Sequence, residues 1–306
     1  MNANSVKAMG AREWIMLVVL SLLWGGSFFF TEIALRGFAP LTLVFLRVSL
    51  AAIALLVYLH AIGLRMPGER AAWIGFFVMG GLNNLIPFSL IVWGQTHIDS
   101  GLASILNATT PLFTVIVAHF LTADEKLTPG RILGVGLGLL GVVILIGPDV
   151  LLGVGAAVLG QIAVLGAALS YGFAGVYGRR FRGTSSAVAS AGMLCGSSVM
   201  LLPMALIFER PFQASPDLAV WGAIVAIAIF STAIAYLLFF RILAAAGATN
   251  VMLVTFLVPV SAMALGIFVL GEAFTLTAAL GMALIFAGLA AVDGRLLTMM
   301  RRRKAA

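Results

Sequence analysis

Long uninterrupted runs of apolar residues, separated by short polar gaps, dominate the chain. Ten such runs of about 20 residues can be marked out, and a helix of that length crosses a hydrocarbon core of roughly 30 Å. The strands of an outer-membrane barrel would instead alternate apolar and polar residues over about 10 positions. The pattern therefore predicts an all-α integral membrane protein with ten transmembrane helices.

Charged residues, Pro and Gly mark the ends of these runs. The first run is about twice as long as the core of a secretory signal, and no small-residue cleavage site follows it promptly, so we expect it to be retained as a span. The gaps are too short to hold a soluble domain of any size. The expected spans are 14–34, 41–60, 71–94, 100–121, 129–147, 155–177, 186–207, 218–240, 248–270 and 275–292.

Composition narrows the class of protein. Apolar residues make up 62% of the 306 residues and charged residues 9%, and the mean hydropathy is +1.15. A soluble domain carries about 25% charged residues, so most of this surface must face a lipid bilayer. The net charge of +7 would suggest a nucleic-acid partner in a soluble protein. Here the cationic residues lie in the gaps between spans, which indicates membrane orientation and no nucleic-acid partner.

The sequence contains few residues that could bind a metal ion or a cofactor. Cys195 is the single cysteine and lies within an apolar run, which excludes a disulfide within the chain. The three histidines, His60, His97 and His119, stand far apart with no second ligand at helical spacing. We expect no metal site and no cofactor.

The Lys and Arg residues are distributed unevenly between alternate gaps. If the N-terminus lies inside, fifteen of the 18 fall on the inner side, Arg36 and Arg210 fall outside, and Arg47 falls within a span. This positive-inside bias predicts an even number of spans with both termini in the cytoplasm. The inner residues are Lys7, Arg12, Arg65, Arg70, Lys126, Arg131, Arg179, Arg180, Arg182, Arg241, Arg295, Arg301, Arg302, Arg303 and Lys304.

The chain resembles itself at an offset of 147 residues. Trp24-Gly25 aligns with Tyr171-Gly172, and Glu125 aligns with Glu272. The two glutamates weigh most, because the chain has only 11 acidic residues and both lie between the fourth and fifth spans of a half. The further matches are Thr128 with Thr275, Gly134 with Gly281, Gly141 with Gly288, Gly147 with Gly294 and, at an offset of 148, Pro111 with Pro259.

A repeat of five spans, an odd number, places the second half upside down relative to the first. We expect two inverted five-helix repeats, residues 1–147 and 148–294, followed by a basic cytoplasmic tail, residues 295–306. Halves related in this way by a pseudo-two-fold axis in the membrane plane enclose a central cavity that opens to one face at a time. The alternative is a duplication kept for packing alone, as in a structural membrane protein.

These features together resemble the drug/metabolite transporter superfamily and, within it, the ten-span EamA-type carriers. Each half has an aromatic-Gly pair in its first span, a Pro within its fourth span and a Glu just after it. The resemblance covers residues 10–295 and rests on this doubled layout. Among these carriers the chain is most similar to bacterial aromatic amino-acid exporters, which implies a multi-pass protein of the bacterial inner membrane. Many EamA-type chains have Trp in both first-span positions, whereas the second is Tyr171 here, so a role that needs paired Trp residues does not carry over.

Polar and aromatic residues at mid-span are expected to face the protein interior, because lipid cannot satisfy their polar groups. Trp24 and Tyr171 lie too deep for the interfacial belt, where Trp14, Trp73 and Trp221 fit. Each polar candidate has a structural alternative, since hydroxyls bond their own helix and asparagine amides join helices. The expected substrate-binding residues are Trp24, Ser27, Asn83, Asn84, Phe88, Asn107, Tyr171, Ser231, Tyr236 and Thr255.

Four further residues are expected to have gating or structural roles. Pro111 and Pro259 each free a backbone carbonyl and permit a bend within a span. Glu125 and Glu272 lie at opposite membrane edges, where each is expected to cap the following helix or to hold the hairpin.

Charged groups are sparse within the spans. We expect no Asp, Glu, Lys or Arg at mid-membrane, and Arg47, one third into its span, is expected to snorkel or to pair near the outer face. Arg47 or His119 could serve ion coupling. The pattern favours facilitated, potential-insensitive export of a neutral or zwitterionic solute. The aromatic candidates favour an aromatic or apolar metabolite, such as an amino acid.

Several other readings of the sequence can be weighed against amino-acid export. Multidrug or other metabolite efflux would use the same apolar pocket, and a pore-type channel could be lined by the same polar residues. A nucleotide-sugar or sugar-phosphate carrier would need cations for several phosphate charges. An enzyme would need a nucleophile with a base, paired carboxylates or a metal set, which the sequence does not offer. Glycines at 134 and 138 could pair two protomers, but packing within one chain, and hence a monomer, is favoured.

Overall fold

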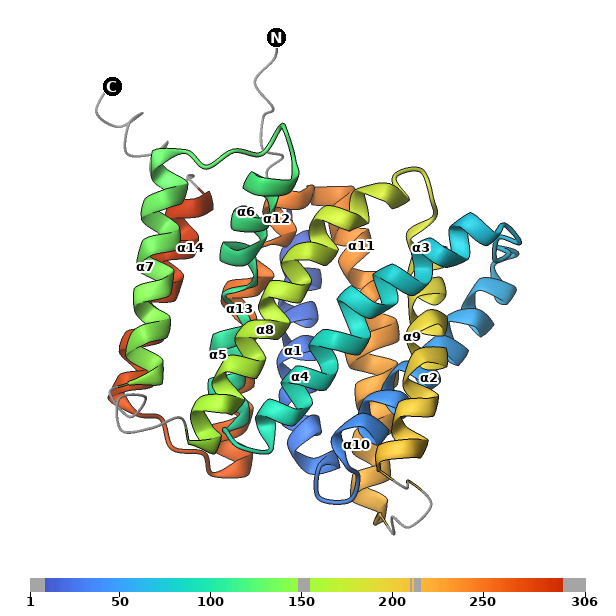
Figure 1. Cartoon of the computed structure of the whole chain (residues 1–306), viewed down its shortest axis with the longest axis horizontal. Helices are drawn as coiled ribbons and strands as arrows, with labels where there is room; N and C mark the ends of the chain where they lie inside the picture. Colours follow the sequence, from blue (N-terminus) through green and yellow to red (C-terminus); the bar gives the residue numbers. More distant parts are fainter. Residues whose placement is uncertain (1–8, 148–154, 210, 212–215, 294–306) are drawn as a thin grey trace.

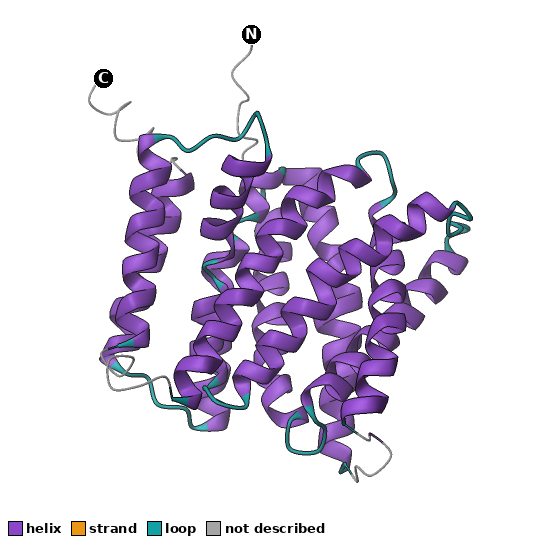
Figure 2. Ribbon diagram, viewed as in Figure 1, coloured by secondary structure: helices purple, strands orange, loops and turns teal. Residues whose placement is uncertain are grey.

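The computed structural model describes residues 9–147, 155–209, 211 and 216–293, and the regular structure within them is helical throughout (Figure 2). The expected tail, residues 295–306, lies outside the described residues. The elements are α1 (Ala11–Ala34), α2 (Pro40–Ala61), α3 (Arg70–Gly80), η1 (Gly81–Leu85), α4 (Ile86–Gln95), α5 (Ser100–Asn107), α6 (Thr110–Leu121), α7 (Pro129–Ile146), α8 (Ala156–Tyr177), η3 (Gly178–Phe181), α9 (Ser186–Phe208), α10 (Leu218–Ala228), η5 (Ile229–Ile234), α11 (Ala235–Ala246), α12 (Ala248–Val251), α13 (Val254–Leu265), η6 (Gly266–Leu270) and α14 (Leu276–Asp293).

The ten expected spans are all present as helices. Within the part of the chain that the structure describes, nine continuous helical segments are long and apolar enough to cross a membrane, and the shorter apolar segment Val254–Leu270 lies where the ninth span is expected. Most ends fall within a few residues of the expectation. The largest differences are in the eighth span, which continues to Ala246, and in the ninth, where α12 and α13 are separate helices. The predicted fold class, an all-α integral membrane protein, is confirmed.

The helices form a bundle whose two ends can be followed in Figure 1. The chain enters α1 and leaves α14 at the same end, and α8 runs in the opposite direction to α1. The pair α7 and α14 lies at one edge, apart from the pair α2 and α9. In the interior α1 packs against α13 and α10, while α8 packs against α6 and α4, so that each half offers its first span to the other half.

Glycines bring α7 and α14 into close contact. A Cβ atom on Gly134 would lie 2.5 Å from the carbonyl oxygen of Gly288, and one on Gly141 would lie 2.7 Å from that of Gly281. Since the repeat aligns Gly134 with Gly281 and Gly141 with Gly288, the two contacts are reciprocal, as at an interface with two-fold symmetry. This glycine face therefore serves packing within one chain.

The glycines of the two aromatic-Gly pairs make a second reciprocal set of contacts. A Cβ on Gly25 would lie 2.8 Å from the backbone nitrogen of Ala262, and one on Gly172 would lie 3.2 Å from that of Thr114. Thr114 and Ala262 are separated by the same offset of 148 that relates Pro111 to Pro259. The absence of a side chain at these glycines lets α1 approach α13 and lets α8 approach α6.

Two of the interior spans change helical geometry near mid-membrane. The π-helical turns η1 and η5 interrupt the third and eighth spans, and they begin at Gly81 and Ile229. Such turns have one extra residue per hydrogen-bonded ring and are frequent at functional sites. The fourth span breaks after Asn107, and Pro111 lies in the first turn of α6, where a missing N–H costs little. Pro259 instead lies inside α13.

Candidate functional site

A hydrogen-bond network joins the two halves of the chain at mid-membrane. The Tyr236 hydroxyl of α11 donates to Asn84 Oδ1 at 2.9 Å, and Asn83 Nδ2 donates to the Tyr236 oxygen at 3.1 Å. Asn84 Nδ2 donates to Ser197 Oγ of α9 at 3.3 Å. Asn84 and Ser197 are fully buried. The π-turn η1 positions both asparagine amides toward the second half, because its wider winding shifts the helix face that carries them.

Arg47 of α2 is part of the same region, and here the structure corrects the sequence analysis. The side chain is only 6% exposed, so it does not snorkel to the surface. The interior of the bundle therefore contains a cation, which the sequence analysis did not expect. Its Nε donates to Thr232 Oγ1 of η5 at 3.0 Å, and its guanidinium carbon lies 3.7 Å from the centroid of the Phe88 ring. An ionised side chain on the lipid face is costly, which is why Arg47 turns inward.

The guanidinium of Arg47 keeps unused hydrogen-bonding capacity. Arginine has five N–H donors, and only the one on Nε is bonded to a described residue. No carboxylate among the described residues forms an ion pair with this group. The face of Phe88 supplies a cation–π contact worth about 2 kcal/mol when desolvated.

Aromatic side chains border this network. Trp24 of α1 and Tyr171 of α8 are half-buried, and both pack against the two hydrophobic clusters that make up the core. The Trp24 ring lies 5.5 Å from the ring of Phe239, which is three residues after Tyr236 in α11. The two residues that the repeat aligns therefore lie between the two clusters rather than at a membrane surface.

The other expected substrate-binding residues lie outside the hydrogen-bond network. Ser27 and Ser231 are buried, and Ser231 Oγ has no hydrogen-bond partner among the described residues. Asn107, at the break in the fourth span, likewise has an unpaired, buried Oδ1 atom. Thr255 donates to the Met252 carbonyl of its own segment at 2.7 Å. Binding by any of these residues stays a prediction.

The two repeat-related glutamates contact different partners, neither of them the helix that follows in sequence. Glu272 accepts hydrogen bonds from the backbone N–H groups of Ser100 and Gly101, both at 3.0 Å, and from the Ser100 hydroxyl. It thus caps α5 of the other half. Glu125 forms an ion pair with Arg179 of η3, which also pairs with Asp124. Both carboxylates join the two halves instead of holding a local hairpin.

The pKa values of two carboxyl groups near the ends of the spans are shifted by ion pairing or by burial. The Arg179 guanidinium lowers the pKa of the exposed Asp124 carboxyl through hydrogen bonds and charge. Partial burial, and then the negative charge of Glu272, raises the pKa of Asp99 in the loop before α5.

His119 accepts a hydrogen bond on Nδ1 from the Leu127 backbone at 3.2 Å, and its coupling role stays a prediction. No group of three metal-ligating side chains occurs within the described ranges.

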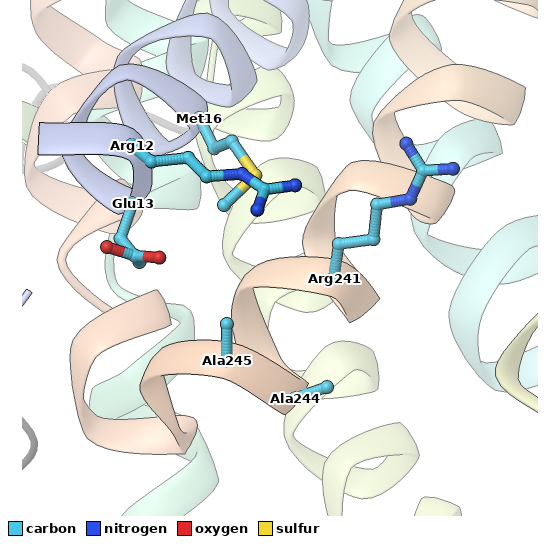
Figure 3. Close-up of a pocket in the computed structure, with 6 residues that line it drawn as sticks. All are labelled: Arg12, Glu13, Met16, Arg241, Ala244 and Ala245. Carbon is cyan, nitrogen blue, oxygen red and sulfur yellow. The ribbon is translucent and has the colours of Figure 1, made fainter. Parts of the chain in front are cut away.

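Two cavities open at the end of the bundle where α1 begins. The larger, about 470 Å³, lies between α1 and α11, and Figure 3 shows Arg12, Met16 and Arg241 around it. The second, about 360 Å³, lies where α3 and η3 meet, beside Arg65 and Arg180. The residues that line these two cavities do not include those of the mid-membrane network.

Comparison with known proteins assigns the family. A family model described as the EamA-like transporter family matches residues 12–147 and again residues 158–292. The chain belongs to the EamA-like transporter family. Each match contains five of the ten spans. The resemblance stated from the doubled aromatic-Gly, Pro and Glu pattern is therefore confirmed at the level of the family.

Three relatives place this EamA-family chain among transporters. It is 28% identical to the "Uncharacterized transporter YoaV" of Bacillus subtilis, over 90% of this chain and 95% of that one. It is 29% identical to the "Uncharacterized inner membrane transporter YedA" of Escherichia coli, over 84% and 82%. It is 26% identical to the "Probable terminal-alkyne amino-acid exporter" of Streptantibioticus cattleyicolor, over 94% and 95%.

A solved structure supports the fold of this EamA-family chain. A crystal structure of a protein superimposes with a TM-score of 0.67 at 22% identity, covering 97% of this chain and 100% of that one. At this identity the likeness concerns the fold alone.

Sequence reasoning does not identify two residues of this region, Arg47 and Ser197, as binding candidates. Arg47 carried a signal in the sequence, because a charged residue within a span faces the interior by default. Ser197 carried none, since serines within membrane helices are common and mostly bond their own helix. Ser197 does so as well, donating to the Met193 carbonyl at 2.9 Å while it accepts from Asn84.

Proposed function

We propose that this transporter exports a small zwitterionic metabolite, an aromatic or apolar amino acid, by alternating access between two inverted five-helix halves. The observation that carries the proposal is the mid-membrane network, in which Asn83 and Asn84 of the first half meet Tyr236 of the second. A contact of this kind, made across the boundary between repeats at the depth of the bilayer centre, is where carriers built from inverted repeats bind their solutes.

Three observations support inverted halves. The family model matches twice, once in each half. The equivalent helices α1 and α8 run in opposite directions (Figure 1). The close contacts of Gly134 with Gly288 and of Gly141 with Gly281 are reciprocal, as a pseudo-two-fold axis in the membrane plane requires. Rocking one half against the other about this axis would open the centre to alternate faces.

Side-chain chemistry and one relative favour an amino acid. The amides and hydroxyls of the network match the ammonium and carboxylate groups of a zwitterion, and Trp24, Tyr171 and Phe88 offer faces for an aromatic or apolar side chain. The exporter from Streptantibioticus cattleyicolor carries the name of an amino-acid exporter. The same apolar surfaces would suit multidrug efflux, which remains the alternative within the family.

We place the protein in the bacterial inner membrane with the ends of α1 and α14 toward the cytoplasm. The described cations on that end of the bundle include Arg12, Arg65, Arg70, Arg131 and Arg241, against Arg36 on the other. Cationic residues are retained on the cytoplasmic side of bacterial membranes. A reporter that is active only in the cytoplasm, fused after α14, should be active.

The test is a flux panel in reconstituted vesicles. Purified protein is inserted into liposomes loaded with each of the 20 amino acids, and efflux is compared with that from protein-free liposomes. We expect saturable efflux of phenylalanine, tyrosine, tryptophan or large aliphatic amino acids, with little for aspartate or lysine. Efflux of hydrophobic cationic dyes with no amino-acid efflux would favour the multidrug alternative and reject the proposal.

A further inference from the structure

The geometry points to Arg47 as the anchor for the substrate carboxylate, an inference that rests on the proposed function and names its substrate class. We infer that the carried solute has one carboxylate group, which pairs with the guanidinium of Arg47 beside Phe88 of α4 and Thr232 of η5. Solutes of the same shape in which an amide or hydrogen replaces the carboxylate should be bound poorly.

The first argument is the unbalanced charge. Arg47 is 6% exposed and lies within a membrane span, yet no carboxylate among the described residues forms an ion pair with it. A guanidinium remains protonated at any physiological pH, so the cation cannot be avoided by loss of a proton. A buried cation is stable only when paired or fully hydrogen-bonded. An anionic ligand supplies what the chain lacks.

The second argument is the direction of the free donors. Nε donates to Thr232 Oγ1, and the guanidinium carbon lies over the face of the Phe88 ring. These two contacts fix the plane of the group and leave Nη1 and Nη2 without hydrogen-bond partners among the described residues. Two parallel N–H groups of one guanidinium match the two oxygens of a carboxylate.

The third argument is the setting of the guanidinium. Arg47 and Phe88 come from the first half and Thr232 from the second, so a ligand held here would touch both halves. Ser231, next to Thr232, has a buried hydroxyl without a hydrogen-bond partner among the described residues. One cation fits one carboxylate, whereas sugar-phosphate or nucleotide-sugar solutes would bring several negative charges.

Matched ligands test the inference without any flux. The purified full-length protein is titrated with phenylalanine, phenylalaninamide, 3-phenylpropionate and phenethylamine, and affinity is obtained from the shift in melting temperature. Phenylalanine and 3-phenylpropionate should bind at least about tenfold more tightly than phenylalaninamide and phenethylamine, the discrimination expected of a charge-assisted, bidentate pair. Equal affinity for the acid and its amide, or no binding of either acid at millimolar concentration, overturns the inference.

Variants of Arg47 test whether this residue causes the preference for carboxylic acids over amides and amines. Arg47→Gln should remove the preference for the acids while leaving the affinity for phenylalaninamide unchanged, and Arg47→Lys should retain a part of it because the point charge remains. Arg36→Gln, at the exposed end of the first span, is the matched control and should behave as wild type. If Arg47→Gln does not fold, the wild-type ligand comparison and Arg47→Lys still decide. An unchanged acid preference in either Arg47 variant overturns the inference.

The binding experiment on Arg47 and the flux panel can fail independently of each other. Binding of acids through Arg47 with no amino-acid efflux would reject the export proposal and keep the carboxylate anchor. Efflux of phenylalanine and phenylalaninamide at equal rates would keep export and reject the anchor.

Discussion

The hydroxyl of Tyr236 donates a hydrogen bond of 2.9 Å to Asn84 Oδ1, and this bond connects the second half of the chain to a fully buried side chain of the first. The bond lies beside a π-helical turn in each half, η1 and η5. Burial of the Asn84 amide oxygen costs free energy unless a donor hydrogen-bonds to it. A movement of one half relative to the other that breaks this bond should therefore be costly, so the bond should favour one relative position of the halves.

Removal of the Tyr236 hydroxyl tests that connection. Tyr236→Phe removes the 2.9 Å donor to Asn84 Oδ1, which keeps only the longer 3.4 Å bond from Asn83 Nδ2. This loss should destabilise the present conformation by about 1–3 kcal/mol and lower the efflux rate several-fold. Tyr177→Phe at the end of α8, whose ring contacts Phe181, is the matched control. Equal efflux from both variants at equal expression would contradict a role for the network in transport.

The aromatic pair of the repeat should matter more than an interfacial aromatic residue. Trp24→Ala or Tyr171→Ala removes a ring that packs against both core clusters, so amino-acid efflux should fall at least about tenfold. Trp221→Ala removes a ring that is 43% exposed and contacts Phe38. Its effect on efflux should be small. Equal losses in the three variants, measured at matched amounts of reconstituted protein, would remove the pocket assignment.

Close packing of α7 against α14 predicts a sharp contrast between two glycines of one helix. A methyl group on Gly141 would lie 2.7 Å from the Gly281 carbonyl oxygen, so Gly141→Ala should lower stability by about 1–3 kcal/mol through overpacking. Gly136 has nothing within 4 Å, and Gly136→Ala should be neutral or stabilising by up to about 1 kcal/mol because alanine favours the helix. Thermal unfolding in detergent measures both. A more harmful Gly136→Ala would contradict the reciprocal packing.

Asp99 gives a prediction that depends on pH. Partial burial and the charge of Glu272 raise its pKa in the folded state above the usual value of 3.8, so ionisation of Asp99 opposes folding. The cost is present above the raised pKa and disappears as pH falls through it toward 3.8. Asp99→Asn should therefore raise the melting temperature near pH 7, and this gain should shrink as the pH is lowered. A gain that is independent of pH would mean that charge is not its cause.

The spans could be predicted from the sequence because lipid imposes a simple demand. A helix that crosses the bilayer needs about 20 apolar residues, and charges at its ends mark the limits. Span 100–121 therefore agrees at both ends with the helical segment Ser100–Leu121. The rule that a charge ends a span predicts an eighth span that stops before Arg241, whereas the helix continues to Ala246 and Arg241 borders a cavity.

The candidate site could be predicted only in part. Asn83, Asn84 and Tyr236 were identified because amides and hydroxyls at mid-span need partners, and the structure brings these three together. The π-turns that aim them have no composition signal, since their winding depends on packing between distant helices. Arg47 was placed at the outer face by counting residues along its span, but its direction depends on Phe88 and Thr232, which are remote in sequence.

Counterflow tests the central claim most directly. Vesicles that contain the protein are loaded with excess unlabelled phenylalanine and diluted into a trace of labelled phenylalanine. A carrier whose site faces one side at a time exchanges the two, so labelled phenylalanine should accumulate transiently above its level in unloaded vesicles. Labelled phenylalanine that only equilibrates, at the same rate in loaded and unloaded vesicles, would indicate an open pore and contradict alternating access.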